Sequence, residues 1–187
     1  KIDLSIDIAE RELEILKKID YENGYSLYIG IPFCPTTCLY CSFTSYPLVS
    51  WRQKVDSYLD ALEKELDYVA IKFGKKHLNS IYIGGGTPTT LEPYQLDRLI
   101  RKIRCSFDLS HCLEFTVEAG RPDSITREKL ETLKKWDITR ISINPQTMKD
   151  ETLKIIGRRH TVAQTVESFQ LARELGFDDI NMDLIMG

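Results

Sequence analysis

Short apolar runs alternate with longer amphipathic stretches along most of the chain. In the short runs apolar side chains recur at every second position, which is typical of strands. These predicted strands cover residues 26–31, 80–84, 114–118, 140–144 and 179–185. Between them apolar side chains recur every three or four residues, as on one face of a helix. The order therefore predicts repeated β/α units and a parallel sheet.

The helical stretches carry their own signals for length and ends. A leading amphipathic helix is predicted over residues 4–19, and a long helix is predicted over residues 51–73. The last helix has Thr161 and Gln164 at capping-box spacing and Gly176 just beyond its end. Its start and its end are therefore both marked in the sequence.

The two faces of the predicted sheet differ in polarity. In the first strand Ile29 and Ile31 point to one face while Tyr28 and Gly30 point to the other, and the same split runs through all five strands. A parallel sheet covered by helices on both faces would be almost continuously apolar. The pattern therefore predicts an α/β fold whose sheet curls around a cavity, a partial (β/α) barrel with a leading helix. Partly solvated strands of a mixed sheet are the alternative.

Barrels of this kind place their chemistry in the loops that leave the C-terminal ends of the strands. The unusual residues of this chain fall there. A cysteine-rich segment, residues 34–41, follows the first predicted strand, and a glycine run, residues 84–89, leaves the second. Glu118 ends the third strand and Gln146 follows the fourth. We therefore expect a site at this edge of the sheet.

Composition and charge narrow the class of protein. The 187 residues are 42% apolar and carry a net charge of −3 without a basic tract, so nucleic acid is not an expected partner. No apolar run reaches the roughly 20 residues of a membrane span, and the start lacks a secretory signal, which indicates a cytoplasmic protein. We expect a leading helical segment, residues 1–22, and a core, residues 23–187, truncated after its fifth strand.

Three of the five cysteines, Cys34, Cys38 and Cys41, crowd into one loop, while Cys105 and Cys112 lie apart. Soft thiolates suit iron-sulfur clusters and zinc. Structural zinc takes four protein ligands, whereas a 4Fe-4S cluster on three cysteines leaves one iron open for a cofactor. No histidine or further cysteine lies close to the loop in the sequence, which favours the cluster. Zinc with a remote fourth ligand and a thioredoxin-like use of Cys38 and Cys41 are the alternatives.

The spacing C-x3-C-x2-C, with Tyr40 just before the third cysteine, resembles the defining motif of radical S-adenosylmethionine enzymes. Within that superfamily four further segments are similar to the oxygen-independent coproporphyrinogen III oxidases. They are YIGIPFC at residues 28–34, GGGTPT at 84–89, RISINPQ at 140–146 and DLIMG at 183–187. Gly30 and the segment EAGRP at 118–122 resemble the HemZ-type branch of the family in particular.

The resemblance implies a 4Fe-4S cluster on the three loop cysteines and S-adenosylmethionine at its open iron, with no catalytic side chain assigned beyond the cluster. It implies cofactor contacts from Tyr28, Tyr40, Gly85, Gly86, Thr87, Glu118, Gln146, Arg158 and Asp183. In the resembled oxidases a 5′-deoxyadenosyl radical takes hydrogen from a propionate of coproporphyrinogen III, and loss of carbon dioxide leads to protoporphyrinogen IX. The implied partners are this porphyrinogen and a low-potential electron donor.

Two positions depart from the best-characterised oxidases. Phe43 stands where they have another cysteine, and Gly30 stands where histidine is common. Relatives with phenylalanine at the first position include haem-trafficking proteins. The alternative function is therefore a haem-binding or haem-trafficking protein that keeps the cluster without oxidase activity.

Overall fold

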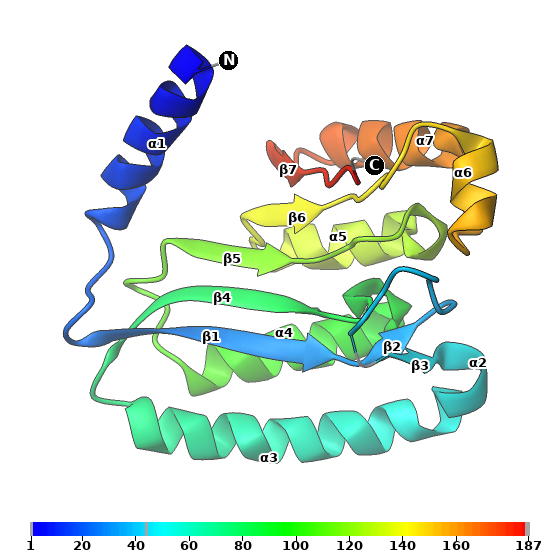
Figure 1. Ribbon diagram of the computed structural model, residues 1–187. Coiled ribbons are helices and arrows are strands. Elements are labelled where there is room, and N and C mark those ends of the chain that lie inside the picture. Colours follow the sequence, from blue (N-terminus) through cyan, green and yellow to red (C-terminus); the bar gives the residue numbers. More distant parts are fainter. Residues whose placement is uncertain (1, 44, 186–187) are drawn as a thin grey trace.

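The computed structural model describes residues 2–43 and 45–185, with side chains from residue 5 onward. Its centre is a five-stranded, fully parallel sheet in the order β1-β4-β5-β6-β7 (Figure 1). The strands are β1 (Gly24–Ile31), β4 (His77–Gly85), β5 (Glu114–Val117), β6 (Arg140–Ser142) and β7 (Asp179–Asn181). All five predicted strands are present. The last two are shorter than predicted, and beyond them an isolated bridge, Gln146 to Leu184, continues the pairing.

Helices and short elements connect these strands. The helices are α1 (Ile2–Leu16), α2 (Leu48–Trp51), α3 (Val55–Phe73), α4 (Pro93–Ser106), α5 (Arg127–Lys135), α6 (Asp150–Ile155) and α7 (Val162–Glu174). Three 3-10 turns are η1 (Arg52–Lys54), η2 (Pro88–Thr90) and η3 (Pro122–Ser124), and β2 (Phe33–Cys34) pairs with β3 (Tyr46–Pro47). The β/α alternation predicted from the sequence is confirmed.

One face of the sheet forms the core, as the alternating pattern predicted. Ile31 and Ile83 are fully buried, in one cluster with side chains of α3, α4, α5 and α7. Each buried isoleucine stabilises the fold by about 1.5–3 kcal/mol. On the opposite face Tyr28 and Tyr82 remain 63% and 38% exposed and their rings stack at 6.0 Å. The helices therefore cover one face and leave the other to form a site.

The ends of the helices test the sequence signals. Thr161 and Gln164 form the predicted capping box of α7, each side chain accepting the other residue's backbone N–H. Gly176 follows the helix with φ +83°, a conformation that glycine adopts without strain. The long helix predicted over 51–73 is wrong at its start, because Trp51 leaves helical geometry at ψ 2° and packs its ring on Tyr46.

The leading helix is present but ends at Leu16, three residues before its predicted end at residue 19. It projects away from the sheet (Figure 1). Its apolar side chains, including Ile8 and Leu13, are about half exposed. Among the described residues, no helix has the length and apolar character that would let it cross a membrane. The division into residues 1–22 and 23–187 stays a prediction.

Candidate functional site

A cavity of about 540 Å³ opens at the C-terminal ends of the strands. Every residue predicted to hold the cluster or the cofactor lines it: Tyr28, Cys34, Cys38, Tyr40, Cys41, Gly85, Gly86, Thr87, Glu118, Gln146, Arg158 and Asp183. The polar sheet face supplies Tyr28 and Tyr82, and the segments that follow β1, β4, β5, β6, α6 and β7 supply the rest of the lining. The structure thus brings these side chains together, while their roles stay predictions.

The cysteine loop follows β1 and is held at both ends. Cys34 closes the short strand β2 and is buried, and its Sγ lies 3.6 Å from the Thr87 hydroxyl. Further along, the Leu39 backbone N–H donates to the carbonyl of Ile156 at the end of α6. Burial raises the pKa of the Cys34 thiol, and Thr87 partly offsets the rise by hydrogen bonding. The loop is therefore held by contacts from two segments that are distant in the sequence, the glycine run and the end of α6.

The glycine run packs directly against this loop. Gly86 donates its backbone N–H to the carbonyl of Ile31 at 2.7 Å, and Thr87 donates to the carbonyl of Phe33 at 2.8 Å. Gly85 has φ +104°, a region that favours glycine. A Cβ on Gly86 would lie 2.7 Å from the Phe33 carbonyl oxygen and 3.0 Å from the Cys34 sulfur. Glycine here lets the backbone approach the first cysteine.

This close approach gives a matched pair of variants. Gly86→Ala is expected to destabilise the fold by about 1–3 kcal/mol, because the backbone must shift to accept the methyl group. It should also lower the iron bound per chain, since Cys34 is displaced. Gly30→Ala is the control, because its nearest neighbour, the Tyr28 ring, would lie at an ordinary 3.6 Å. Urea unfolding and iron analysis measure both effects, and equal behaviour of the two variants would contradict the prediction.

Two carboxylates, those of Glu118 and Asp183, line the cavity close to each other. Burial raises the pKa of Glu118, and the nearby Asp183 carboxylate raises it further, while a hydrogen bond from Tyr82 opposes the shift. Burial, with Glu118 adding to it, raises the pKa of Tyr82 to about 12. Both groups can therefore exchange hydrogen bonds with a polar ligand. This wall suits amino and hydroxyl groups.

Two further predicted residues are held in defined positions. Gln146 has φ +63°, which is rare for a residue with a side chain, and its N–H donates to the Asp183 carbonyl at 3.0 Å. Backbone strain of this kind is often found at functional sites. Arg158 donates to the Tyr40 hydroxyl, with Nη2 at 2.7 Å and Nε at 3.1 Å. The pair joins the cysteine loop to the segment after α6.

Four residues with no role assigned from the sequence also line the cavity, Tyr82, Gly120, Arg121 and Asn144, as does Phe43, which the sequence marked only as a departure from the oxidases. Tyr82 and Asn144 could have been found, because both stand on the polar face that the alternation defines. One sequence feature could have pointed to Arg121: it is a charged residue in a loop at the C-terminal edge of the sheet. It is only 3% exposed, and its contacts in space have no trace in the local sequence.

The donor set fits the cluster better than a single ion. Within residues 2–43 and 45–185, no three Cys, His, Asp or Glu side chains converge closely enough to hold one metal ion. A cubane instead binds each cysteine through a different iron, so its ligands stand further apart. Cys105 is exposed, and Cys112 makes its contact elsewhere, with the carbonyl of Glu114 at 3.3 Å. Zinc with a remote fourth ligand stays the alternative.

Known proteins of similar sequence carry names related to haem synthesis and haem transfer. The chain is 46% identical over its full length to the oxygen-independent coproporphyrinogen-III oxidase-like protein HemZ of Bacillus subtilis. Over 87% of its length it is 45% identical to the heme chaperone HemW of the same organism. The chain spans 38% and 42% of these two relatives.

Known structures agree with the predicted fold. Coproporphyrinogen III oxidase (HemN) from Escherichia coli, a radical SAM enzyme, matches 94% of the chain with a TM-score of 0.80 and 31% identity. The match covers 40% of that enzyme and confirms the partial (β/α) barrel. The Radical SAM superfamily matches residues 28–187, which include the cysteine loop, the second half of β1 and the other four strands. This chain therefore belongs to the radical SAM superfamily.

Proposed function

We propose that the chain is the radical-generating core of an enzyme that converts coproporphyrinogen III to protoporphyrinogen IX by oxidative decarboxylation without oxygen. Cys34, Cys38 and Cys41 would hold a 4Fe-4S cluster, with S-adenosylmethionine beside it. One observation carries the proposal: the three thiols share a single cavity with every residue expected to contact the cofactor. The relatives named as oxidases support the substrate class.

Each wall of the cavity has a part in this function. The cluster and cofactor, when bound, supply a radical that can abstract a hydrogen atom from the substrate. The backbone of Gly85 and Gly86 would lie against the cofactor, because no side chain blocks the approach. Glu118 would accept hydrogen bonds from its amino or ribose groups. Arg158 offers a guanidinium that can pair with a carboxylate.

A second hollow supports a large substrate that has an apolar ring system and charged side groups. It has a volume of about 730 Å³ and shares Tyr40 and Gln146 with the cofactor cavity. Met148, Ile156 and Leu184 give it an apolar lining. A tetrapyrrole placed there would lie next to the radical source.

The expected cellular location and partners follow from the same chemistry. All five cysteines are free thiols, which fits a reducing compartment, and we propose a cytoplasmic location. The cluster would need a low-potential electron donor. A net charge of −3 with no basic tract gives no support to a nucleic-acid partner.

Haem carriage is the second candidate, and Phe43 favours it. Its side chain lines the cavity and is 73% exposed, so it presents an apolar ring where the best-characterised oxidases have a cysteine. An exposed aromatic ring can pack on a flat macrocycle. The HemW relative, a heme chaperone, is almost as similar in sequence as HemZ.

Anaerobic turnover distinguishes the two functions. The cluster-loaded protein is incubated with coproporphyrinogen III, S-adenosylmethionine and a reductant, and the porphyrins and 5′-deoxyadenosine are quantified. The proposed enzyme should release carbon dioxide and form protoporphyrinogen IX. If 5′-deoxyadenosine forms with no porphyrin conversion, and haem binds stoichiometrically in an absorption titration, carriage replaces decarboxylation as the function.

A further inference from the structure

We propose that Arg121 is a positioning residue for the cluster, which fixes the cysteine loop through Thr36 and raises the cluster's reduction potential from beside Cys38. This inference rests on the proposed cluster. It concerns a residue that sequence reasoning left without a role.

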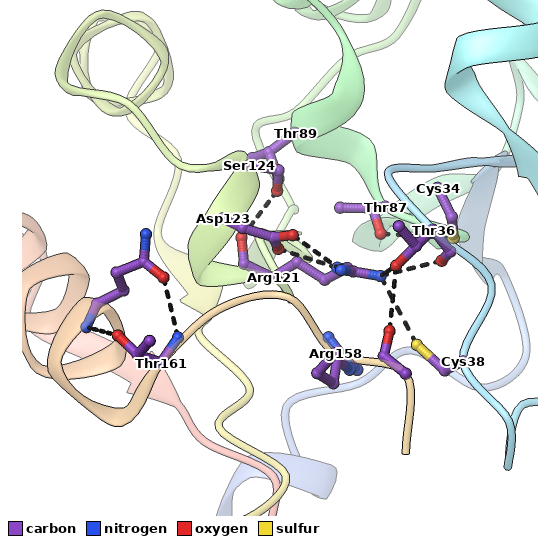
Figure 2. A network of polar contacts seen from close by, with 12 residues as sticks. Cys34, Thr36, Cys38, Thr87, Thr89, Arg121, Asp123, Ser124, Arg158 and Thr161 are labelled. Carbon is purple, nitrogen blue, oxygen red and sulfur yellow. Dashed lines mark hydrogen bonds and ion pairs between the residues drawn. The ribbon is translucent and has the colours of Figure 1, made fainter. Parts of the chain in front are cut away.

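The contacts of the Arg121 guanidinium divide into two groups (Figure 2). Towards its own loop, Nε and Nη2 donate to the two carboxylate oxygens of Asp123 at 3.0 and 2.8 Å. Towards the cysteine loop, Nη1 donates to the Thr36 carbonyl at 3.0 Å and to its hydroxyl at 2.8 Å. The same nitrogen lies 3.7 Å from the Cys38 sulfur. One cation thus joins the loop after β5 to the cluster motif.

The orientation of Arg121 is fixed by burial and by its neighbours. The side chains of Arg121 and Asp123 are 3% and 15% exposed, so the ion pair is shielded from solvent. The Ser124 hydroxyl donates to the Arg121 carbonyl at 2.8 Å and lies 2.6 Å from the Thr89 hydroxyl. Lys129 then donates to the carbonyls of Thr89 and Ser124 at 2.6 and 3.2 Å. This network holds the guanidinium in place before any cluster binds.

The paired geometry decides the electrostatic effect. Asp123 takes the Nε–Nη2 edge of the guanidinium, so Nη1, on the other side, faces Thr36 and the Cys38 sulfur while the carboxylate lies behind it. Reduction adds a negative charge to the cluster, and hydrogen bonds to its sulfurs are among the factors that set its potential. A fixed N–H donor beside Cys38 stabilises the reduced form more than the oxidised form. The potential is therefore raised.

A residue that only braced the loop would behave differently. Loss of a brace lowers the amount of cluster assembled, yet leaves the potential of the assembled clusters unchanged. The two roles are separable because Thr36 takes part in the bracing and carries no charge. The midpoint potential is the readout that distinguishes them.

The test uses anaerobically reconstituted protein, with iron and sulfide counted and midpoint potentials taken from titrations followed by electron paramagnetic resonance. In Arg121→Gln we expect severalfold less cluster and a more negative midpoint. In Asp123→Asn the counter-charge is lost, and we expect the opposite shift, to a less negative midpoint. Thr36→Val should lose cluster content with its midpoint unchanged. Arg98→Gln, whose partners Asp60 and Glu63 lie on α3, is the matched control and should resemble the parent.

Two results would overturn the inference. One is a midpoint in Arg121→Gln equal to that of the parent. The other, decisive where Arg121→Gln assembles no cluster, is an unchanged or more negative midpoint in Asp123→Asn. A parent protein that binds no 4Fe-4S cluster would instead overturn the proposed function, and this inference with it.

Discussion

Replacement of Cys38 by alanine is expected to lower the iron and sulfide bound per chain by more than about tenfold, since loss of a direct ligand exceeds the 10–100-fold cost of losing an outer contact. Without Cys38 two thiols remain, those of Cys34, which is buried beside Thr87, and of Cys41 in the same loop. Two thiols cannot enclose the cluster alone. Cys34→Ala and Cys41→Ala should behave like Cys38→Ala. Iron and sulfide assays and the visible spectrum after anaerobic reconstitution measure the loss.

The chain offers its own control for this experiment. Cys105 is exposed on α4, away from the cavity, so Cys105→Ala should bind as much cluster as the parent. Cys112→Ala should do the same. If Cys38→Ala retains its cluster while Cys105→Ala loses it, the loop cysteines do not bind the cluster, and the assignment of the site is contradicted. Uptake of zinc in preference to iron and sulfide would contradict the cluster assignment itself.

The sheet and its site were predictable because their determinants are local. Side chains alternate along a strand, so Ile29 and Ile31 mark the core face and Glu118 and Gln146 mark the open one. Parallel strands bring their C-terminal ends to one edge, which is why residues far apart in the sequence meet there. Periodicity and direction together were enough to place the cavity.

What the sequence missed depends on contacts between distant segments. Arg121 lies 83 positions from Cys38, and no local pattern joins the two. The break before α3 escaped notice because Trp51 fits the helical spacing, yet its ring packs on Tyr46. The leading helix was predicted from its apolar stripe, but a stripe does not say whether another surface covers it. Side-chain partners and burial need three dimensions.

The carboxylate of Glu118 is expected to lower the stability of the fold and to strengthen binding of the cofactor. Its pKa is raised mainly by burial, so the folded protein binds this proton more tightly than the unfolded chain does. Stability therefore falls as the pH rises from the ordinary glutamate range through the raised pKa, and the cost persists at neutral pH. Glu118→Gln removes the buried charge, and the cofactor-free variant should unfold at a higher temperature than the parent at pH 7. At a pH below the ordinary range the two should converge.

The same substitution should weaken the cofactor complex. A hydrogen bond to a charged group is worth about 1.5–3 kcal/mol, so Glu118→Gln is expected to raise the Kd for S-adenosylmethionine by about 10- to 100-fold. Glu114→Gln is the matched control, because Glu114 begins β5, the strand that Glu118 directly follows, but pairs with Arg140 and does not line the cavity. Anaerobic calorimetry on the cluster-loaded protein measures both affinities. If Glu118→Gln binds as tightly as Glu114→Gln, the carboxylate does not contact the cofactor, because both variants lose a charge and only one loses it at the site.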